Sequence, residues 1–337
     1  MDSENEQKPE STLGDAQPAA SLAEAPDSIA ARRALTRLLR KRVKKFIALV
    51  PELSADAPPK TVHDVRVWSR RLQQAIGGLF PKPRPGKVRR LRRMPRRIRR
   101  ALGEWRNCDV LLEMVAKQQR RTRSEAKQRA WAWVRDYLAQ KRGKEVARAE
   151  KKLARVDLGG YTALVQSLLK QPPEETPEVL MERLRDSARR AWDKWQTALS
   201  RAQETRAVDD LHRFRIATKD LRYRTELLLD VGHRQVKSQI KWLAELQEAQ
   251  GFWHDRQVLD QAVAEAVARA EILLKELPAA RILLAELETD QSRQSQEVEK
   301  IFRLATEQPG RRQMESRSEN SLTPNPSPRG QGVRAEE

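Results

Sequence analysis

The sequence predicts an all-α protein. Gly accounts for only 13 of the 337 residues, and no segment shows the alternation of apolar and polar residues that a half-buried strand requires. Leu, Ala, Arg, Glu and Gln dominate long runs in which apolar residues recur every three or four positions, as they do in amphipathic helices. Apolar residues make up 39% of the chain, which is enough for a packed core. We therefore expect a helical fold of one large domain or two of ordinary size.

Segments rich in Pro and Gly divide the chain. Residues 1–26 and 310–337 lack apolar periodicity and are rich in Glu, Ser and Pro, so we expect both ends to be disordered tails. Between them, PELSADAPP, PKPRPG, LGG and QPPEETP separate the amphipathic segments. We predict helices at about 29–50, 61–80, 87–121, 123–156, 160–170, 177–204, 208–231, 235–252, 255–276 and 278–307. Pro95 should kink or interrupt the third of these helices.

Two sequence blocks recur at nearly the same offset, which indicates an internal duplication. HDVRVWSRRLQ at 63–73 aligns with HRFRIATKDLR at 212–222, an offset of 149 residues. LGEWRNCDV at 102–110 aligns with QGFWHDRQV at 250–258, an offset of 148. We therefore expect one ordered domain over 27–309, with a first repeat at about 29–170 and a second at about 177–308.

The chain is strongly basic. It carries 67 Lys and Arg against 47 acidic residues, a formal net charge of +20. Residues 61–150 alone hold 26 basic and 8 acidic residues, so nearly all of the excess lies in the first half. The charge predicts an anionic partner, which could be a nucleic acid, a membrane headgroup or a polyphosphorylated molecule.

The cysteine count and the distribution of apolar residues restrict the kinds of site and the cellular location that we expect. The single Cys108 excludes an intramolecular disulfide and any multi-cysteine metal site, and we interpret it as a small core residue. No stretch approaches the roughly 18 apolar residues of a membrane span, and the acidic, polar N-terminus does not resemble a signal peptide. We expect a cytoplasmic protein with no membrane insertion, no metal and no cofactor. The oligomeric state stays open.

The two aligned histidine segments each form a basic helix face. At about 100° per residue, Arg66 and Arg70 lie within a narrow sector around His63, while Val65 and Leu72 lie opposite. The second copy places His212, Arg215, Lys219 and Arg222 at the matching angles, with Tyr223 beside His212. Each helix thus presents hydrogen-bond donors and positive charge at intervals of about 5 Å.

This pattern favours the binding of a chain of phosphates. Arg offers bidentate hydrogen bonds to phosphate, and His can become imidazolium beside an anion, with each charge-assisted bond contributing about 1.5–3 kcal/mol. The alternative is that these are ordinary solvated charges, which is the usual role of an Arg-rich face. Two of the four His residues have basic residues at both +3 and +7, at matching positions of the two copies, which favours a functional role.

An arginine-rich segment, KVRRLRRMPRRIRRALGEWR at 87–106, extends the basic surface. It holds eight arginines between 89 and 100, and like charges four residues apart on a helix repel each other. Such a density indicates a nearby anion. The side opposite the apolar residues carries Arg89, Arg92, Arg93, Arg96 and Arg100.

The paired segments HxxRxxxRRLQ and HxxRxxxKxLRY, each followed by an LG or QG helix ending in DV or QV, resemble the CHAD family, the conserved-histidine α-helical domain. The resemblance covers roughly residues 26–309. It implies two helical bundles related by pseudo-twofold symmetry, with basic residues of both halves converging on a central cleft or pore that binds inorganic polyphosphate. The implied site consists of His63, Arg66, Arg70, His212, Arg215, Lys219 and Arg222, helped by the arginines of 89–100.

Two residues of the first half differ from the family pattern. Gln73 stands where the family pattern has a basic residue, and Asn107 stands where an LGxxRD motif would have Asp, whereas Asp255 keeps the carboxylate in the second copy. The first half is therefore expected to hold a ligand more through its arginine-rich helix than through its histidine helix. No ExExK signature of the enzyme module fused to some family members is present.

Three functions remain in competition. The leading one is non-catalytic binding of polyphosphate, with association to polyphosphate granules; it should weaken with salt and be strongest near or below the His pKa of about 6.5. The second is non-specific binding of nucleic acid, although no recognition motif supports it. The third is a phosphatase or phosphoryl-transfer enzyme with His63 or His212 as nucleophile, but neither helix face carries a positioned acid or metal site. His233 and His254 are isolated in sequence and are interpreted as structural or exposed.

Overall fold

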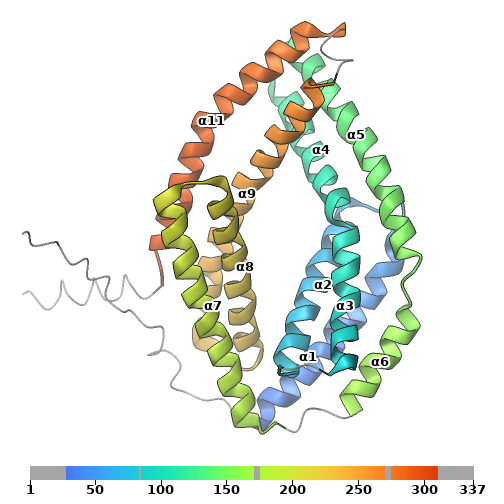
Figure 1. Cartoon of the computed structure of the whole chain (residues 1–337), viewed down its shortest axis with the longest axis vertical. Helices are drawn as coiled ribbons and strands as arrows, with labels where there is room; N and C mark the ends of the chain where they lie inside the picture. The colour runs from blue at the N-terminus through green and yellow to red at the C-terminus, as the bar shows by residue number, and fades with distance from the viewer. Residues whose placement is uncertain (1–27, 83–84, 171–174, 270–274, 310–337) are drawn as a thin grey trace, which may run out of the picture.

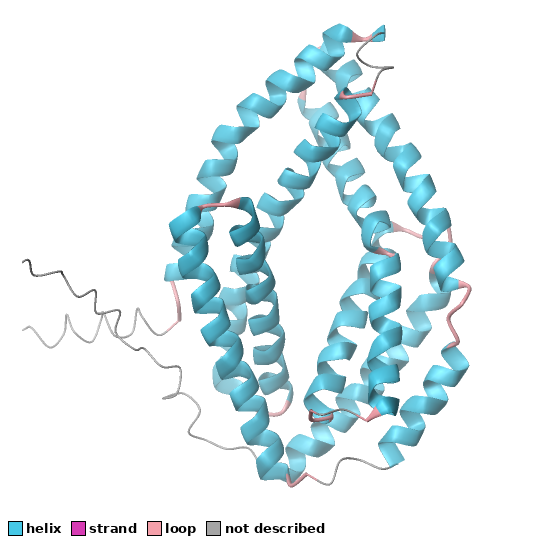
Figure 2. Cartoon of the chain, viewed as in Figure 1, coloured by secondary structure: helices cyan, strands magenta, loops and turns pink. Residues whose placement is uncertain are grey.

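The computed structural model describes residues 28–82, 85–170, 175–269 and 275–309. Within these ranges every regular element is a helix and no strand is present (Figure 2). The all-α prediction is therefore confirmed. None of the helices there has both the length and the apolar composition that crossing a membrane requires. The tails predicted at 1–26 and 310–337 fall outside the described residues.

The α-helices described in the first half of the chain range from 13 residues in α6 to 29 in α5. Its elements are α1 Ser28–Leu49, the 3-10 helix η2 Val50–Glu52, α2 Pro59–Leu79, α3 Gly86–Ala101, α4 Gly103–Arg121, α5 Glu125–Leu153 and α6 Leu158–Lys170. Pro59 occupies the first position of α2, where the missing N–H removes no helical hydrogen bond. Ser124 caps α5 by accepting a hydrogen bond from the main-chain N–H of Lys127 at 3.4 Å.

Among the described residues, the second half has fewer and longer helices than the first. Its elements are α7 Pro177–Thr205, α8 Val208–Asp230, the 3-10 helix η3 Arg234–Val236, α9 Lys237–Val267 and α11 Leu277–Thr306. Thr176 caps α7 by accepting from Val179 N–H at 3.4 Å. Arg206, in the left-handed conformation with φ of 52°, ends α7, and Gly232 with φ of 108° forms the turn after α8. The order α1, α2, α3–α4, α5 matches the order α7, α8, α9, α11, and the duplication itself stays a prediction.

Three predicted boundaries were wrong. The helix expected at 87–121 is two helices that separate at Leu102, and the helices expected at 235–252 and 255–276 are one, α9. Pro95 lies inside α3, which continues for six residues beyond it. Gly251 does not end a helix because the residues around it pack: Gln250 and Trp253 are buried, and that packing outweighs the roughly 1 kcal/mol cost of a helical Gly.

The side chains pack into three hydrophobic cores. The first joins α1, α2, α3 and α6 to the start of α7 and the end of α8. The second lies among α7, α8, α9 and α11 around Trp195 and Phe214. The third is built jointly by α4 and α5 of the first half and α9 and α11 of the second. The halves therefore form two arms that meet through this third core at the top of Figure 1 and through α1 and α7 at the bottom.

The C-terminal end of α2 packs closely on the second half. A Cβ at Gly78 would lie 2.5 Å from Leu227 Cδ2 of α8 and 3.5 Å from Leu184 Cδ2 of α7. Arg183 of α7 donates from Nη2 to the carbonyl oxygen of Gly78 at 3.0 Å. Because Gly has no side chain, α2 can approach α7 and α8 at this point, which places the basic faces of α2 and α8 near each other.

Candidate functional site

The basic face of α2 lies against α3. Arg66 donates from Nη1 to the carbonyl oxygen of Arg99 at 2.9 Å, near the C-terminal end of α3, where main-chain carbonyl groups carry partial negative charge. Gln73 donates from Nε2 to the carbonyl oxygen of Arg92 at 3.0 Å, and its Oε1 accepts a hydrogen bond from Arg99. Gln73, a departure from the family pattern, thus joins α2 to α3 and holds the Arg99 side chain.

The arginines of this region are crowded and unneutralised. The pKa of Arg66 falls to about 10, mainly because of burial and secondly because of the charges of Arg70 and Arg106. Burial also lowers the pKa of Arg99 to about 10, with Arg70 and Arg66 as the next causes. Within the described residues, none of these four arginines forms an ion pair with a carboxylate. Four cations from α2, α3 and α4 therefore lie near one another.

A direct contact joins the first half to the second. Arg70 of α2 donates from Nη1 to the hydroxyl oxygen of Tyr223 on α8 at 3.1 Å. The Arg70 guanidinium carbon also lies 5.6 Å from the centroid of the Tyr223 ring, a cation–π distance. The two histidine helices predicted from the sequence therefore do face each other, although the residues in contact are Arg70 and Tyr223 rather than the two histidines.

Lys219 of α8 is the most strongly perturbed cation at this junction. Burial is the main reason that its pKa falls to about 7, and the charges of Arg215, Arg70 and Arg66 add to the effect. Burial also lowers the pKa of Arg215, whose Nε is enclosed and has no hydrogen-bond partner in the described structure. The charge of Asp255 offsets only part of this effect, and half-buried cations are costly unless an anion pairs with them.

Helix α9 adds two groups to the junction. The ring centroids of His254 and His212 are 5.3 Å apart. Burial lowers the pKa of His254 to about 4, assisted by Arg215, His212 and Lys219. Burial also raises the pKa of Asp255, although Arg215 and Lys219 oppose this shift. His254, which is isolated in sequence, is not exposed: it is half-buried against His212 among these cations, and a structural role for it stays a prediction. His233 is fully buried.

We use two names for the cations below. The inner cluster consists of Arg66, Arg70, Arg99, Arg106, Arg215 and Lys219. The outer row consists of Arg89, Arg93, Arg96 and Arg100, which are all exposed on α3. Among the remaining predicted residues, Arg92 is half-buried near Arg96 and Arg224, and Arg222 is paired with Glu226 at 3.0 Å.

The histidines of the two helices are weak bases here. His63 is exposed but its pKa is lowered, first by desolvation and then by the charge of Arg106. Burial, Arg215 and Lys219 lower the pKa of His212. Both imidazoles therefore have a smaller tendency to carry charge near pH 6.5 than a free histidine, which changes the expected source of any pH dependence.

The sequence predicted neither Arg106 nor His254 at the site, and it included Arg99 only as one of the arginines of 89–100. Arg99 lies seven residues after Arg92, so both occupy the same flank of α3, between the apolar stripe and the outer row. That flank faces α2, as the Gln73 bonds show. The helical angle could have separated Arg92 and Arg99 from the outer row, whereas only the fold brings Arg106 and His254 to the junction.

Other features lie away from this junction. Cys108 is buried, and burial raises its pKa to about 11, so the thiol stays protonated at neutral pH. A cavity of about 690 Å³ lies between α1 and α6, and a smaller one of about 230 Å³ lies among α1, α2 and α8. Neither is lined by the inner cluster, and the central basic cleft stays a prediction.

Solved structures of other proteins have a similar fold. The chain is similar to the crystal structure of the CHAD domain from the plant Ricinus communis, with a TM-score of 0.58 and 20% identity, over 82% of this chain and 92% of that one. It is also similar to PptA from Streptomyces chartreusis, with a TM-score of 0.63 and 17% identity, over 82% of this chain and 99% of that one. No curated protein matches the sequence.

At these identities the structural likeness shows the fold alone. The family is shown by the sequence: the model of the CHAD domain matches residues 37–264, well over half of the chain. This protein therefore belongs to the CHAD family.

Proposed function

We propose that this protein binds inorganic polyphosphate through the inner cluster, with Tyr223 and His212 as neutral donors beside it. The observation that carries the proposal is the half-buried Lys219 beside Arg70 and Arg215, whose pKa falls to about 7 because desolvation and these neighbouring cations oppose its charge. A phosphate chain would supply the missing negative charge, and guanidinium groups would donate paired hydrogen bonds to its oxygens.

A chain of phosphates fits better than a single anion. The inner cluster draws its cations from α2, α3, α4 and α8, so its charge is distributed over several helices. Arg70 and Lys219 come from different halves and still influence each other, because Arg70 is among the charges that lower the pKa of Lys219. A linear polyanion can contact all of these groups at once, whereas one phosphate would neutralise only part of the charge.

The proposal is that binding occurs without catalysis. A nucleophilic histidine needs a partner that orients it or activates it. Asp255 is the carboxylate whose charge acts on Arg215 and Lys219, and no hydrogen bond joins it to His212 or His254 in the described structure. A protein that holds polyphosphate in this way would be recruited to polyphosphate granules. The check is to incubate the protein with polyphosphate and Mg²⁺ and follow released phosphate: release above the buffer control would replace binding with hydrolysis.

The affinity should be measured by calorimetry with long-chain polyphosphate over a salt series. We expect wild-type affinity to fall steeply with salt, because neutralised phosphates release counterions. The variant Arg70→Gln/Lys219→Gln should lose about 100-fold in affinity, since it removes two charge-assisted contacts. The matched control is Arg90→Gln/Arg97→Gln, which removes the same charge from exposed positions of α3. Equal losses in the two variants would reject the inner cluster as the site.

Non-specific nucleic-acid binding is the second candidate, because the outer row presents four exposed arginines on one helix. Competition separates the two functions. Duplex DNA or RNA, added at equal phosphate concentration, should leave bound polyphosphate in place if the buried inner cluster is the site. Displacement by either nucleic acid would favour the second candidate.

A further inference from the structure

Helix α7 carries an arginine on the face that packs against its neighbours. On this face Met181 and Trp192 are buried and Ala188 is partly buried. Arg185 lies four residues after Met181 and seven before Trp192, so it occupies the same face of the helix. Met181 belongs to the first hydrophobic core and Trp192 to the second. Arg185 therefore takes a position between two cores where an apolar side chain would be expected.

The donor atoms of Arg185 are enclosed without a partner. Its Nε and Nη2 atoms are buried, and no described residue accepts a hydrogen bond from either. Within the described residues it forms no ion pair, and the adjacent carboxylate of Asp186 pairs with Arg189 at 2.9 Å instead. Arginine stays protonated in proteins, so Arg185 cannot remove the cost of this burial by losing its proton.

A buried histidine adds another unpaired donor. His233, in the turn between α8 and η3, is fully buried. Gln235 donates from Nε2 to His233 Nδ1 at 3.2 Å, and only a ring nitrogen without hydrogen can accept that bond. The hydrogen of the neutral ring therefore lies on Nε2. This atom is buried as well, and it has no partner among the described residues.

Arg185 and His233 belong to the same region of the interior. Leu184, next to Arg185, lies in the first hydrophobic core, and so do Val231 and Val236 on either side of His233. The pKa of His233 is lowered, first by burial and then by the charge of Arg185. The imidazole is therefore neutral near pH 7, and the two side chains together carry one positive charge. They offer enclosed N–H groups, and what they lack is an acceptor with a negative charge.

We propose that Arg185 and His233 bind a small monovalent anion, chloride, between α7 and the turn that follows α8. The unpaired groups are all N–H donors, so the ligand must accept hydrogen bonds. One negative charge makes the site neutral, whereas a phosphate dianion would leave a buried charge without compensation. Because the donor atoms are enclosed, the ion must be small.

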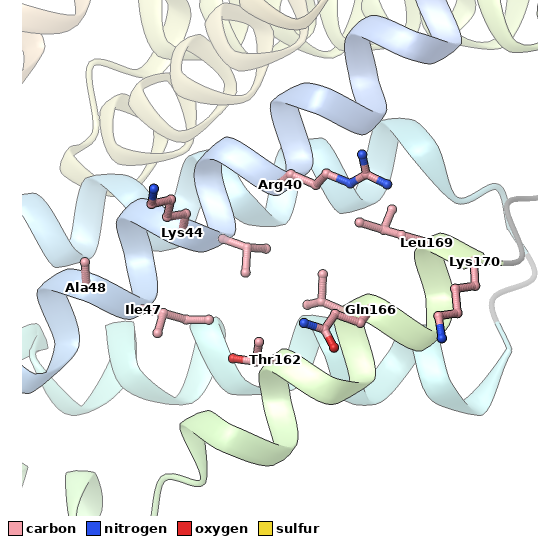
Figure 3. A pocket seen from close by; sticks show the side chains of 10 residues that line it. Arg40, Lys44, Ile47, Ala48, Thr162, Gln166, Leu169 and Lys170 are labelled. Atoms are coloured by element: carbon pink, nitrogen blue, oxygen red, sulfur yellow. The ribbon is translucent and has the colours of Figure 1, made fainter.

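The chloride site is distinct from the other features of the molecule. It shares no residue with the inner cluster. It is also separate from the cavity between α1 and α6 that Figure 3 shows, because no lining residue of that cavity belongs to α7 or to the turn after α8. Its occupant would act on the stability of the second half rather than on polyphosphate.

Thermal unfolding of the full chain tests the proposal. Chloride replaces gluconate at constant ionic strength, since gluconate is too large for an enclosed site. A ligand that binds only the folded state raises the Tm by mass action. We expect the Tm to rise by about 4 °C between chloride-free buffer and about 0.1 M chloride. A Tm that does not respond to chloride would mean that a water molecule accepts these hydrogen bonds, and it would overturn the proposal.

Substitutions assign the response to Arg185. Arg185→Met should lose the dependence of Tm on chloride. In chloride-free buffer this variant should have a higher Tm than wild type, because an apolar side chain replaces an unpaired cation. The matched control is Lys194→Met, which removes the same charge from an exposed position of α7 and should keep the full response. If both variants respond alike, chloride acts on the overall positive charge of the protein and the proposal fails.

Two further measurements exclude other locations. Arg70→Gln/Lys219→Gln should retain the chloride response, and its loss in this variant would place the anion at the inner cluster and contradict the proposal. Crystals grown in bromide give an anomalous signal that locates the ion without any substitution. We expect a bromide peak within hydrogen-bonding distance of His233 Nε2 and the Arg185 guanidinium, and none there in Arg185→Met. Wild-type crystals without that peak would refute the site.

Discussion

The basic surfaces of the two halves meet at the same junction but differ in chemistry. The first half contributes Arg66, Arg70, Arg99 and Arg106, whose guanidinium groups stay charged throughout the physiological range. The second half contributes Lys219 with a pKa near 7, the neutral pair His212 and His254, and the carboxylate of Asp255. If the halves arose by duplication, one copy has become a fixed cationic surface and the other a titratable one.

The difference has a physical origin in burial. Arg66 and Arg99 keep their charge although burial lowers their pKa, because a guanidinium starts from a pKa far above neutrality. Lys219 starts lower, so a similar environment brings its pKa to about 7. The proposed ligand would therefore meet fixed charge on one side and, on the other, charge that depends on pH.

The largest loss of polyphosphate affinity should follow from replacing arginines of the first half, whose charge does not change with pH. Arg70→Gln/Arg106→Gln should weaken polyphosphate binding by about 100-fold at both pH 6 and pH 9, because both charges are present at every pH between these values. Calorimetry at the two pH values measures the effect, with Arg90→Gln/Arg97→Gln as the control. A loss confined to pH 6 would contradict the division between fixed and titratable halves.

Replacing Lys219 should cause a smaller loss of polyphosphate affinity, and the size of this loss should depend on pH. Its free-state pKa is about 7, and a bound phosphate would raise that pKa, so wild-type affinity should be highest below pH 7 and fall as the pH rises above it. Lys219→Gln should bind about tenfold more weakly at pH 6 and nearly as well as wild type at pH 9.

Proton uptake provides a second measurement of the same linkage. Wild-type binding at pH 8 should take up protons, detected as a binding enthalpy that changes with the ionisation enthalpy of the buffer. Lys219→Gln should lose most of this dependence. Unchanged uptake in the variant would assign the proton to His212 or His254 instead.

Lys219 should lower the free energy of unfolding of the protein when no ligand is bound. Below pH 7 Lys219 is protonated in both the folded and the unfolded chain, so the full cost of its buried charge applies; between pH 7 and about 10.5 the folded protein releases the proton first and stability rises. Lys219→Met should therefore raise the free energy of unfolding by about 2 kcal/mol at pH 6, and by less at pH 9. Urea unfolding measures this, with the exposed Lys45→Met as control; an equal gain at both pH values would contradict it.

Much of the fold could be predicted from the sequence. Helical period, caps and breakers located most helices, because each amphipathic stripe must cover a core. The predicted break at 253–254, just after Gly251, and the missed break at Leu102 show the limit of local signals. Whether a Gly ends a helix depends on tertiary packing, here that of Gln250 and Trp253, which no window of sequence contains.

The site was predicted less completely. Helical angles on the two histidine helices predicted the basic faces of α2 and α8, because residues three and four apart share a face. The same reasoning treated the arginines of α3 as one surface, whereas Arg99 donates a hydrogen bond to Gln73 of α2, Arg92 is half-buried near Arg224 of α8, and the outer row is exposed. The pKa of Lys219 could not be predicted either, since it results from burial and from the charges of Arg66 and Arg70 on α2 as well as Arg215 on its own helix.

The smallest loss of polyphosphate affinity should follow from substitutions in the outer row, which distinguishes it from the inner cluster. Arg93→Gln/Arg100→Gln removes two exposed charges and should weaken polyphosphate binding only about threefold at low salt, with less effect as salt rises, because exposed charges are screened. The loss should be the same at pH 6 and pH 9, since arginine does not titrate there. A salt series at both pH values measures it. If the loss instead equals that of Arg70→Gln/Arg106→Gln, the exposed face of α3 is the main binding surface, and burial does not distinguish the two sets of cations.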